Sequence, residues 1–418
     1  MKILNKKIHF FNPGHENAVW TNNPHYTPPA SVCKMMTDLE LLPVWYGNDK
    51  DYVIINETDE ALHFLLSLPA CIRPLPIPIS PSELQHRILL SEGLVEAAPW
   101  GLSPHSILFF ETLIKPSPIN SIDNPMPINN ILIPTWNDTY KNLTGRQTAL
   151  RCLSKIRSLL PNDFETLTLP RFCSTTDEIR HFMAEYPPPY ILKTPYSCSG
   201  RGLHRIQTHI LEQQDLRRIE GYFKKQGIVS IERALDKVCD FAMEFESDGT
   251  GHIRFKGLSV FNTLLNGSYS GNLLGNQDVL EKYIVKYIQI AHLRKIQDAV
   301  ISILTEALGF DYRGFLGVDM LIYRKDNTYA IHPFIEINLR YTMGLVALQL
   351  GNRIVHPSSR GQLVISCNTT TNKTYNTHHQ MKIKYPLQLS ESKIHSGYLS
   401  LCPVLPDTQY HAYIIIEN

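Results

Sequence analysis

Three oxygen-bearing side chains in the last third of the chain have the types and spacing of a metal site. Asp319 stands in one apolar stretch, a polar turn follows at residues 325–327, and Glu336 and Asn338 stand in a second apolar stretch. The pattern predicts a β-hairpin in which Glu336 and Asn338 share a face, because side chains alternate along a strand, with Asp319 roughly opposite. Two carboxylates and an amide oxygen suit Mg²⁺. The alternative is the solvent-facing polar side of an edge hairpin.

A second candidate is a lysine at the end of an apolar strand, followed by a loop of small residues. Lys193 ends the stretch 190–193, and the loop contains Ser197, Ser199, Gly200, Arg201 and Gly202. Small residues let backbone N–H groups approach phosphate oxygens, and the lysine offers a point charge. The G-x-x-x-x-G-K spacing of a Walker A loop is absent. A hairpin turn beside a surface lysine would explain the same residues.

Residues 228–245 form the third stretch, which reads as a strand, a short loop and another strand. Glu232 precedes the loop, and Asp236 and Asp240 lie within or after it. Alone the stretch is weak evidence for a binding site, because most acidic residues in such loops are exposed to solvent.

In this order the three stretches resemble the ATP-grasp superfamily. Its members carry a lysine at a strand end, then a glycine-rich loop, then a V-x-x-E hinge, then D…E-x-N on an antiparallel sheet. The resemblance covers residues 130 to 350, and the E-x-N-x-R sequence that ends at Arg340 is its most specific piece. The first part of the chain, where short apolar strands alternate with helices, fits the Rossmann-like pre-ATP-grasp domain of that family.

The resemblance implies a set of ATP ligands and a metal site. The residues that would bind ATP are Arg146, Lys193, Ser197, Ser199, Gly200, Arg201, Gly202, Glu232, Leu235 and Asp240, with Asp236 as the alternative ribose ligand. Asp319, Glu336 and Asn338 would hold one or two Mg²⁺ ions, with Mn²⁺ as an alternative. Arg340, which would neutralise the phosphoryl group during transfer, and Arg201 are the residues assigned to catalysis.

The activity implied is an ATP-dependent ligase that joins a carboxylate to an amine, or to a thiol, through an acylphosphate. The substrate would be an amino acid, a peptide or another small metabolite. An ATP-grasp kinase for small molecules and a non-catalytic nucleotide-binding module are the alternatives. Members of the superfamily are often dimers, so a homodimer is one of the states that the resemblance allows.

Two further segments are candidates for binding the acceptor substrate. His15 and Glu16 follow the first predicted strand, where ligands gather in open α/β sheets. Asn262, Tyr269 and Asn272 lie in a segment rich in small, amide and aromatic residues. A rigid turn with exposed polar groups is the favoured explanation of the first segment, and a β-hairpin with an Asn-Gly turn is the alternative for the second.

The composition argues against nucleic-acid-binding, membrane and exported classes of protein. Lys and Arg number 40 against 39 Asp and Glu, so the net charge of +1 indicates neither a nucleic-acid-binding protein nor an anionic membrane partner. We find no signal peptide and no apolar run near the ~18 residues that a membrane span needs. The eight cysteines form no C-x-x-C pair, which favours reduced thiols in a cytoplasmic protein.

The expected fold class is a multidomain α/β and α+β chain, with two ATP-grasp lobes preceded by an open parallel sheet. We expect domains at 1–125 (pre-ATP-grasp), 130–228 (small lobe), 229–352 (large lobe) and 353–418 (C-terminal extension). Among individual elements we expect a strand at 44–46, an extended surface stretch at 74–81 and one long helix from 278 to 308. Residues 366–377 and the pair His378-His379 read as loops.

Overall fold

The computed structural model describes residues 6–84, 94–115, 131–197, 202–264 and 267–417. The chain divides into two compact units. The first contains Met1–Asn137, Gly271–Leu280 and Arg340–Asn418, and the second contains Asp138–Ser270 and Glu281–Leu339. The boundaries of these two units differ from those of the four predicted domains, which stay a prediction.

The first unit contains an open parallel sheet in the order β3-β2-β1-β4-β5. Its strands are β1 (Lys6–Phe10), β2 (Tyr52–Ile54), β3 (Ile77–Ile79), β4 (Val95–Pro99) and β5 (Ile131–Leu132). The helices between them are α1 (His15–Thr21), α2 (Ala30–Asp38), η1 (Leu42–Trp45), α3 (Thr58–Ser67), η2 (Ala70–Ile72) and α5 (Pro104–Leu113). The core includes Ile8, Ile54, Ile79 and Phe110, all nearly inaccessible to solvent. The predicted parallel α/β lead domain is therefore present.

Two predictions within this sheet region are wrong. Residues 44–46 lie in and just after the 3₁₀ helix η1 and form no strand, because Pro43 near its start fixes φ and has no N–H for a ladder. Residues 77–79 are a paired strand in place of a surface stretch, and Pro78 and Ile79 are buried.

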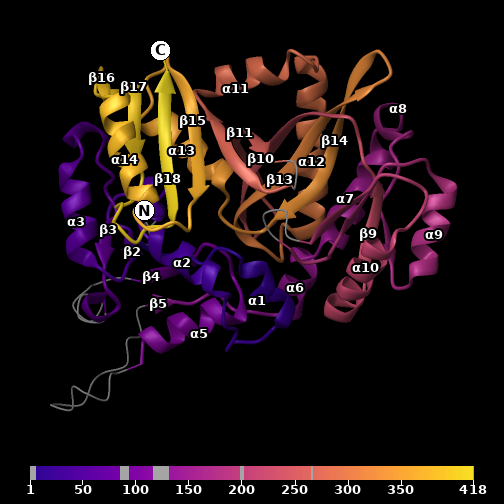
Figure 1. Cartoon of the computed structure of the whole chain (residues 1–418), viewed down its shortest axis with the longest axis horizontal. Coiled ribbons are helices and arrows are strands. Elements are labelled where there is room, and N and C mark those ends of the chain that lie inside the picture. Colours follow the sequence, from indigo (N-terminus) through magenta and orange to yellow (C-terminus); the bar gives the residue numbers. More distant parts are fainter. Residues whose placement is uncertain (1–5, 85–93, 116–130, 198–201, 265–266, 418) are drawn as a thin grey trace. The chain divides into compact units, whose positions relative to one another are not determined.

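The first unit also contains antiparallel strands in the order β12-β15-β18-β17-β16, of which β12 crosses the boundary between the units and the other four come from the C-terminal part of the chain. The elements are β12 (Tyr269–Leu274), α13 (Met343–Arg353), β15 (Arg360–Cys367), α14 (Lys373–Lys384), β16 (Gln388–Ser390), β17 (Lys393–Ser400) and β18 (Tyr410–Glu417). In Figure 1, β15, β18 and β17 lie side by side, and α14 packs against β17.

The predicted loop at His378-His379 is wrong. Both residues belong to α14, and His378 Nδ1 lies 2.7 Å from the hydroxyl of Tyr398 on β17. The helix was not evident from the sequence because its polar residues give it little apolar periodicity.

The second unit begins with helices and a four-stranded antiparallel arrangement in the order β6-β9-β7-β8. Its elements are α6 (Asp138–Thr144), α7 (Arg146–Leu159), α8 (Pro161–Phe164), β6 (Arg171–Cys173), α9 (Thr176–Glu185), β7 (Tyr190–Lys193), β8 (Leu203–Ile206), α10 (Gln213–Gln226) and β9 (Val229–Arg233). Thr175 caps α9 in a capping box with Glu178, which fixes where that helix begins. Buried Phe182, Tyr190 and Ile231 belong to one core under this sheet.

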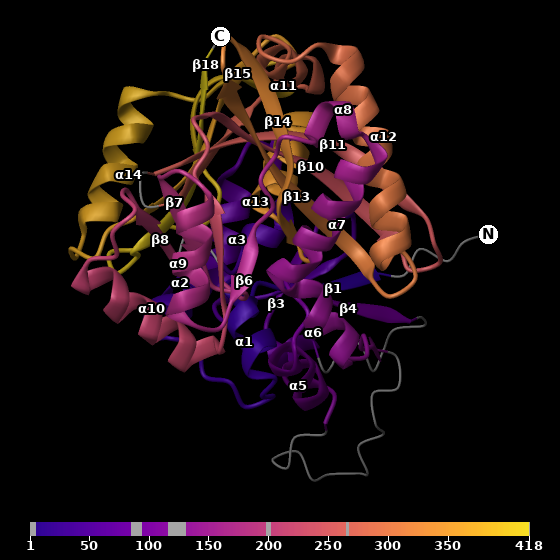
Figure 2. The same ribbon diagram turned by 90° about the vertical axis from the view of Figure 1, so that its right-hand side faces the viewer.

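The long strands of the second unit run in the order β14-β13-β10-β11. They are β10 (Lys237–Asp248), β11 (Ile253–Thr263), β13 (Arg313–Lys325) and β14 (Thr328–Asn338), with the helices α11 (Gln277–Ile284), which crosses the boundary between the units, and α12 (Ile290–Leu308). Helix α7 packs against α12 and β14 (Figure 2). The single helix expected at 278–308 is two helices, and the apolar spacing hides the break because Ile284 at the end of α11 and Ile288 within the break are both buried.

Candidate active site

The predicted metal ligands lie on one face of the hairpin formed by β13 and β14. Asp319 pairs with Glu336 in the antiparallel register, and Gly317 pairs with Asn338. Asn338 Nδ2 donates a hydrogen bond to Asp319 Oδ2 at 3.1 Å. The predicted hairpin is confirmed, and alternation along each strand brings all three side chains together.

Arg146, the first residue of α7, joins this face to the segment that follows β7. Its Nη2 donates to Glu336 Oε2 at 3.0 Å and to Ser197 Oγ at 3.3 Å. Its Nε donates to the backbone oxygen of Thr194 at 3.2 Å. One guanidinium therefore holds the start of the predicted phosphate loop beside a predicted metal ligand, a task that its planar fork of donors suits.

Lys193 ends β7 as predicted and is buried, at 6% exposure. Its ammonium forms an ion pair with Glu232 on the neighbouring strand β9. A buried lysine needs such a partner, because an unpaired charge in the interior is costly. The alternative of an ordinary surface lysine is therefore wrong.

The phosphate loop is described only at its two ends. Ser197 is buried, and Gly202 has φ of 84°. A side chain at Gly202 would collide with Thr194, so glycine is required there by both backbone and space. Ser199, Gly200 and Arg201 lie outside the described residues.

The two candidate ribose ligands differ in their surroundings. Asp240 accepts a hydrogen bond from Thr263 Oγ1 at 2.8 Å and pairs with Lys237, so its carboxylate is fixed. The Asp236 side chain is 69% exposed. Leu235 lies in the loop between β9 and β10 and is half-buried. These positions favour Asp240 over Asp236, and both assignments stay predictions.

Two residues on the same face were missed by the sequence reasoning. Glu244, at 2% exposure, pairs with Gly317 in the β10–β13 register, one strand from Asn338. His332, at 4% exposure, pairs with Leu321, two residues from Asp319 on the same side of β13. Glu244 could not be recognised before the strand pairing was known, because it stands in an ordinary apolar strand. His332 stands at the same alternation as Glu336 and Asn338, which was the sequence signal for it.

His332 is close enough to the Lys193–Glu232 pair for their charges to act on it. Burial is the largest cause that lowers its pKa, and the charge of Lys193 adds to this while that of Glu232 opposes it, leaving a pKa of about 4. Its Nδ1 has no hydrogen-bond partner in the described part of the chain. His332 is therefore a neutral imidazole on the face that carries the predicted metal ligands.

The candidate acceptor residues His15 and Glu16 are both buried, so the exposed-turn alternative is wrong. Glu16 Oε1 accepts a hydrogen bond from Arg340 Nε at 2.7 Å, and both residues belong to the first unit. Burial alone raises the pKa of Glu16, but the charges of His15 and Arg340 outweigh it and hold the pKa below its ordinary value. His15 packs against Gly101, where any side chain would meet its ring.

The second group of candidate acceptor residues lies on strands. Asn262 belongs to β11, and Tyr269 and Asn272 belong to β12. The backbone N–H of Leu264 donates to the Ser268 oxygen at 2.8 Å across the turn, as a hairpin requires. Burial, and then the charge of Glu244, raise the pKa of Tyr269. The hairpin alternative thus describes the local fold, and substrate contact stays a prediction.

The donor set fits a hard cation such as Mg²⁺. Asp319, Glu336 and Asn338 supply two carboxylates and an amide on adjacent strands. Among the described residues, no three His, Cys, Asp or Glu side chains cluster as metal ligands. No helix in the described ranges has the length and apolarity of a transmembrane span.

Comparisons with known proteins bear on the fold. The biotin carboxylase domain of the Hydrogenobacter thermophilus 2-oxoglutarate carboxylase, solved with MgADP, ADP and bicarbonate, has a TM-score of 0.53 and 12% identity over 98% of this chain and 86% of that one. Biotin carboxylase from Campylobacter jejuni, solved with a β,γ-ATP ligand, has a TM-score of 0.50 and 12% identity over 99% of this chain and 87% of that one. No protein-family model matches the sequence, and no curated protein matches it. The predicted fold is confirmed by these structural matches: the chain has the ATP-grasp fold.

Proposed function

We propose that the chain is an ATP-dependent ligase that joins a carboxylate to an amine through an acylphosphate. The observation that carries the proposal is the position of Arg146, which contacts both Ser197 and Glu336. The same guanidinium thus contacts the predicted phosphate loop and the predicted metal face, as a site for a metal-bound polyphosphate requires.

In this proposal, residues of the second unit bind different groups of Mg-ATP. Lys193 and Arg146 supply positive charge for the phosphates of ATP, and Glu232 accepts from the adenine amino group. Asp319, Glu336 and Asn338 hold Mg²⁺, which when bound offsets phosphate charge. The two biotin carboxylases were solved with adenine nucleotides, one of them as MgADP, which supports ATP and Mg²⁺ here.

The reaction needs no protein nucleophile. An oxygen of the substrate carboxylate attacks the γ-phosphorus of ATP, and the bond to the β,γ-bridging oxygen breaks to release ADP. The amine nitrogen then attacks the acyl carbon, phosphate leaves with the electrons of the C–O bond, and the nitrogen loses a proton. Charge from Lys193 and Arg146 lowers the barrier of the first step by stabilising the transferring group.

The substrate is proposed only as a class: an amino acid, peptide or small metabolite. We also propose a homodimer, as the H. thermophilus biotin carboxylase domain was solved as a dimer, and a cytoplasmic location. Light scattering on the purified chain tests the homodimer, and a mass near 47.8 kDa, that of one chain, would contradict it.

The function is tested by measuring ADP and phosphate release with Mg-ATP over a matrix of carboxylates paired with amines. A ligase releases both products only when an active carboxylate and amine are present together. A stable phosphorylated product without the amine would point to a kinase instead. Glu336→Gln should abolish turnover, while the exposed Glu306→Gln on α12 serves as the matched control.

A further inference from the structure

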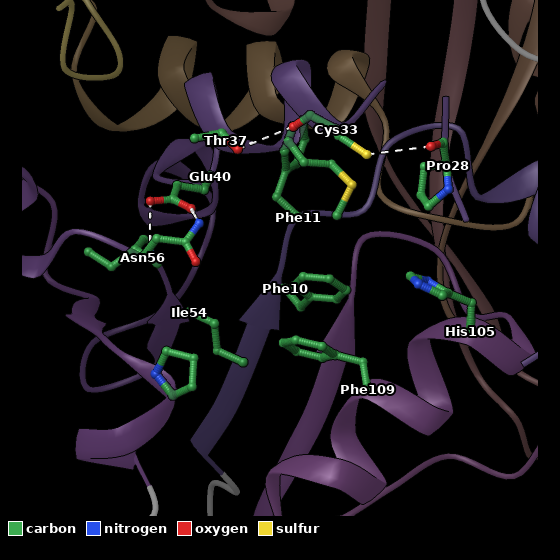
Figure 3. A pocket seen from close by; sticks show the side chains of 13 residues that line it. Phe10, Phe11, Pro28, Cys33, Thr37, Glu40, Ile54, Asn56, His105 and Phe109 are labelled. Carbon is green, nitrogen blue, oxygen red and sulfur yellow. Dashed lines mark hydrogen bonds between the residues drawn. The ribbon is translucent and has the colours of Figure 1, made fainter. Parts of the chain in front are cut away.

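The first unit contains a cavity of about 350 Å³ beside its parallel sheet. It opens at the carboxyl ends of β1 and β2, between α2 and α5. The residues that line it are Phe10, Phe11, Pro28, Cys33, Met36, Thr37, Glu40, Ile54, Ile55, Asn56, Pro81, His105 and Phe109 (Figure 3). Its volume is in the range of small-molecule sites.

The cavity lies where parallel sheets bind ligands. The strand order β3-β2-β1-β4-β5 reverses direction at β1, because β2 follows on one side and β4 on the other. Ligands of open α/β sheets bind beyond the carboxyl ends of the strands at such a reversal. The segment after β1 reads Asn12-Pro13-Gly14-His15 and lacks the glycine-rich turn that a dinucleotide pyrophosphate needs. The site therefore suits a smaller ligand.

The charges of the lining residues favour a cationic ligand over an anionic one. They include one carboxyl group, that of Glu40, and no lysine or arginine. An anion would enter without a compensating charge and would face a carboxylate, which is unfavourable in a partly desolvated site. A cation would instead pair with Glu40.

Glu40 is held in place by Asn56, which lies two residues beyond the end of β2. Its Oε1 accepts a hydrogen bond from the Asn56 backbone N–H at 2.8 Å, and its Oε2 accepts from Asn56 Nδ2 at 2.6 Å. Burial raises the pKa of Glu40 to about 7, against the lowering effect of these hydrogen bonds. A partner cation in the cavity would favour the charged form of the carboxyl group and lower that pKa.

The rest of the cavity is apolar and aromatic. Phe10 and Phe109 stack with ring centroids 3.9 Å apart, and both are drawn below α2 in Figure 3. His105 stands on the side away from Glu40 (Figure 3), where Tyr26 meets its ring edge to face. These walls offer van der Waals contact to a ring or branched chain but few polar groups.

We propose that this cavity binds a small primary amine with an aromatic or other apolar body, whose ammonium group pairs with Glu40 and whose body packs on Phe10 and Phe109. The site lies wholly within the first unit. Binding of the amine does not require ATP, so this proposal is tested independently of the proposed ligase activity.

Calorimetry with 2-phenylethylamine as the probe tests the proposal, on the full chain without nucleotide at about pH 8. We expect saturable binding of the amine and none of 3-phenylpropanoate, its anionic counterpart. Glu40→Gln should weaken amine binding at least tenfold, and Glu60→Gln on the exposed first turn of α3 should leave it unchanged. Equal binding of both probes, or of the amine to Glu40→Gln, would overturn the charge pairing.

Two measurements keep the test valid if Glu40→Gln unfolds. Thr37→Trp, at an exposed position of α2, should fill the cavity and abolish binding without touching the Glu40–Asn56 contact. Alkylation of the wild type, read by mass spectrometry, should show the amine protecting Cys33, which lines the cavity, but not Cys71, which is exposed elsewhere. Binding that survives Thr37→Trp, or equal labelling of Cys33 with and without the amine, would overturn the location.

Discussion

Arg146 Nη2 lies 3.0 Å from Glu336 Oε2, and the same nitrogen donates to Ser197 at 3.3 Å. The Arg146 side chain is 9% exposed and that of Glu336 is 25% exposed, so water competes little for the guanidinium. This contact couples the start of the α7 helix to two segments that lie far from it in the sequence. It is the geometric basis of the proposed ATP site.

Arg146→Lys should weaken ATP binding although it keeps the charge. A lysine presents one point charge and cannot contact Glu336, Ser197 and the Thr194 oxygen together. Charge-assisted hydrogen bonds contribute about 1.5–3 kcal/mol each, so we expect the Kd for Mg-ATP to rise at least tenfold by calorimetry. Arg151→Lys, five residues further along α7 and exposed, is the matched control. An equal effect there would count against a specific role for Arg146.

Lys193→Ala should lower both ATP affinity and stability. The variant leaves Glu232 without its buried partner, and breaking such a pair costs about 3 kcal/mol. The double variant Lys193→Ala/Glu232→Ala should recover part of the free energy of unfolding but not the ATP affinity. Urea titration and calorimetry measure the two effects, and unchanged ATP affinity in Lys193→Ala would remove this lysine from the site.

The Glu16–Arg340 pair should make stability depend on acid. The pKa of Glu16 is held below its ordinary value of 4.5 in the folded chain, so its stabilising effect is complete above that pH and is lost as the pH falls through the lowered value. Glu16→Gln should therefore be less stable than wild type by about 3 kcal/mol near neutral pH. Urea titrations below about pH 4 should show the difference shrinking, and a constant difference would contradict the ion pair.

His332 should also make stability fall as the pH drops, but in a higher pH range than Glu16. Its pKa is 6.5 ordinarily and about 4 when folded, so the unfolded chain takes up the proton first. Stability from this group is complete above pH 6.5 and falls by about 3 kcal/mol as the pH drops to 4. His332→Gln should flatten the wild-type slope in that range, while the exposed His252→Gln should not. An unchanged slope in His332→Gln would show that the imidazole is not buried as described.

Much of the structure of the second unit could be predicted from the sequence, because the patterns that indicate it lie within short stretches of the chain. The shared face of Glu336 and Asn338 follows from alternation after one polar turn, and Lys193 at a strand end follows from an apolar run. The exact pairing of Asp319 with Glu336 does not follow, because the register shifts between Asp319 and Leu321. Glu244 could not be placed, because its face is defined by the pairing of β10 with β13, a strand remote in sequence. The ion pair between Glu16 and Arg340 joins residues 324 positions apart, which no spacing rule reaches.

The first unit shows where local patterns mislead. The apolar run at 44–46 marks burial, and the preceding Leu42-Pro43 makes it a 3₁₀ helix in place of a strand. His378 stands in a polar helix with little periodicity, and only its contact with Tyr398 shows that it is partly enclosed. The cavity beside Glu40 likewise depends on residues from several strands and helices, so no local sequence pattern indicated it.

Calorimetric titration of the purified chain with ATP, with and without Mg²⁺, tests the central claim most directly because it needs no knowledge of the substrate. We predict saturable binding that is strengthened by Mg²⁺, and loss of that strengthening in Glu336→Gln and in Asp319→Asn but not in Glu306→Gln. Absence of ATP binding to the folded wild type, or the same dependence on Mg²⁺ in all three variants, would contradict the ATP site on the face of β13 and β14.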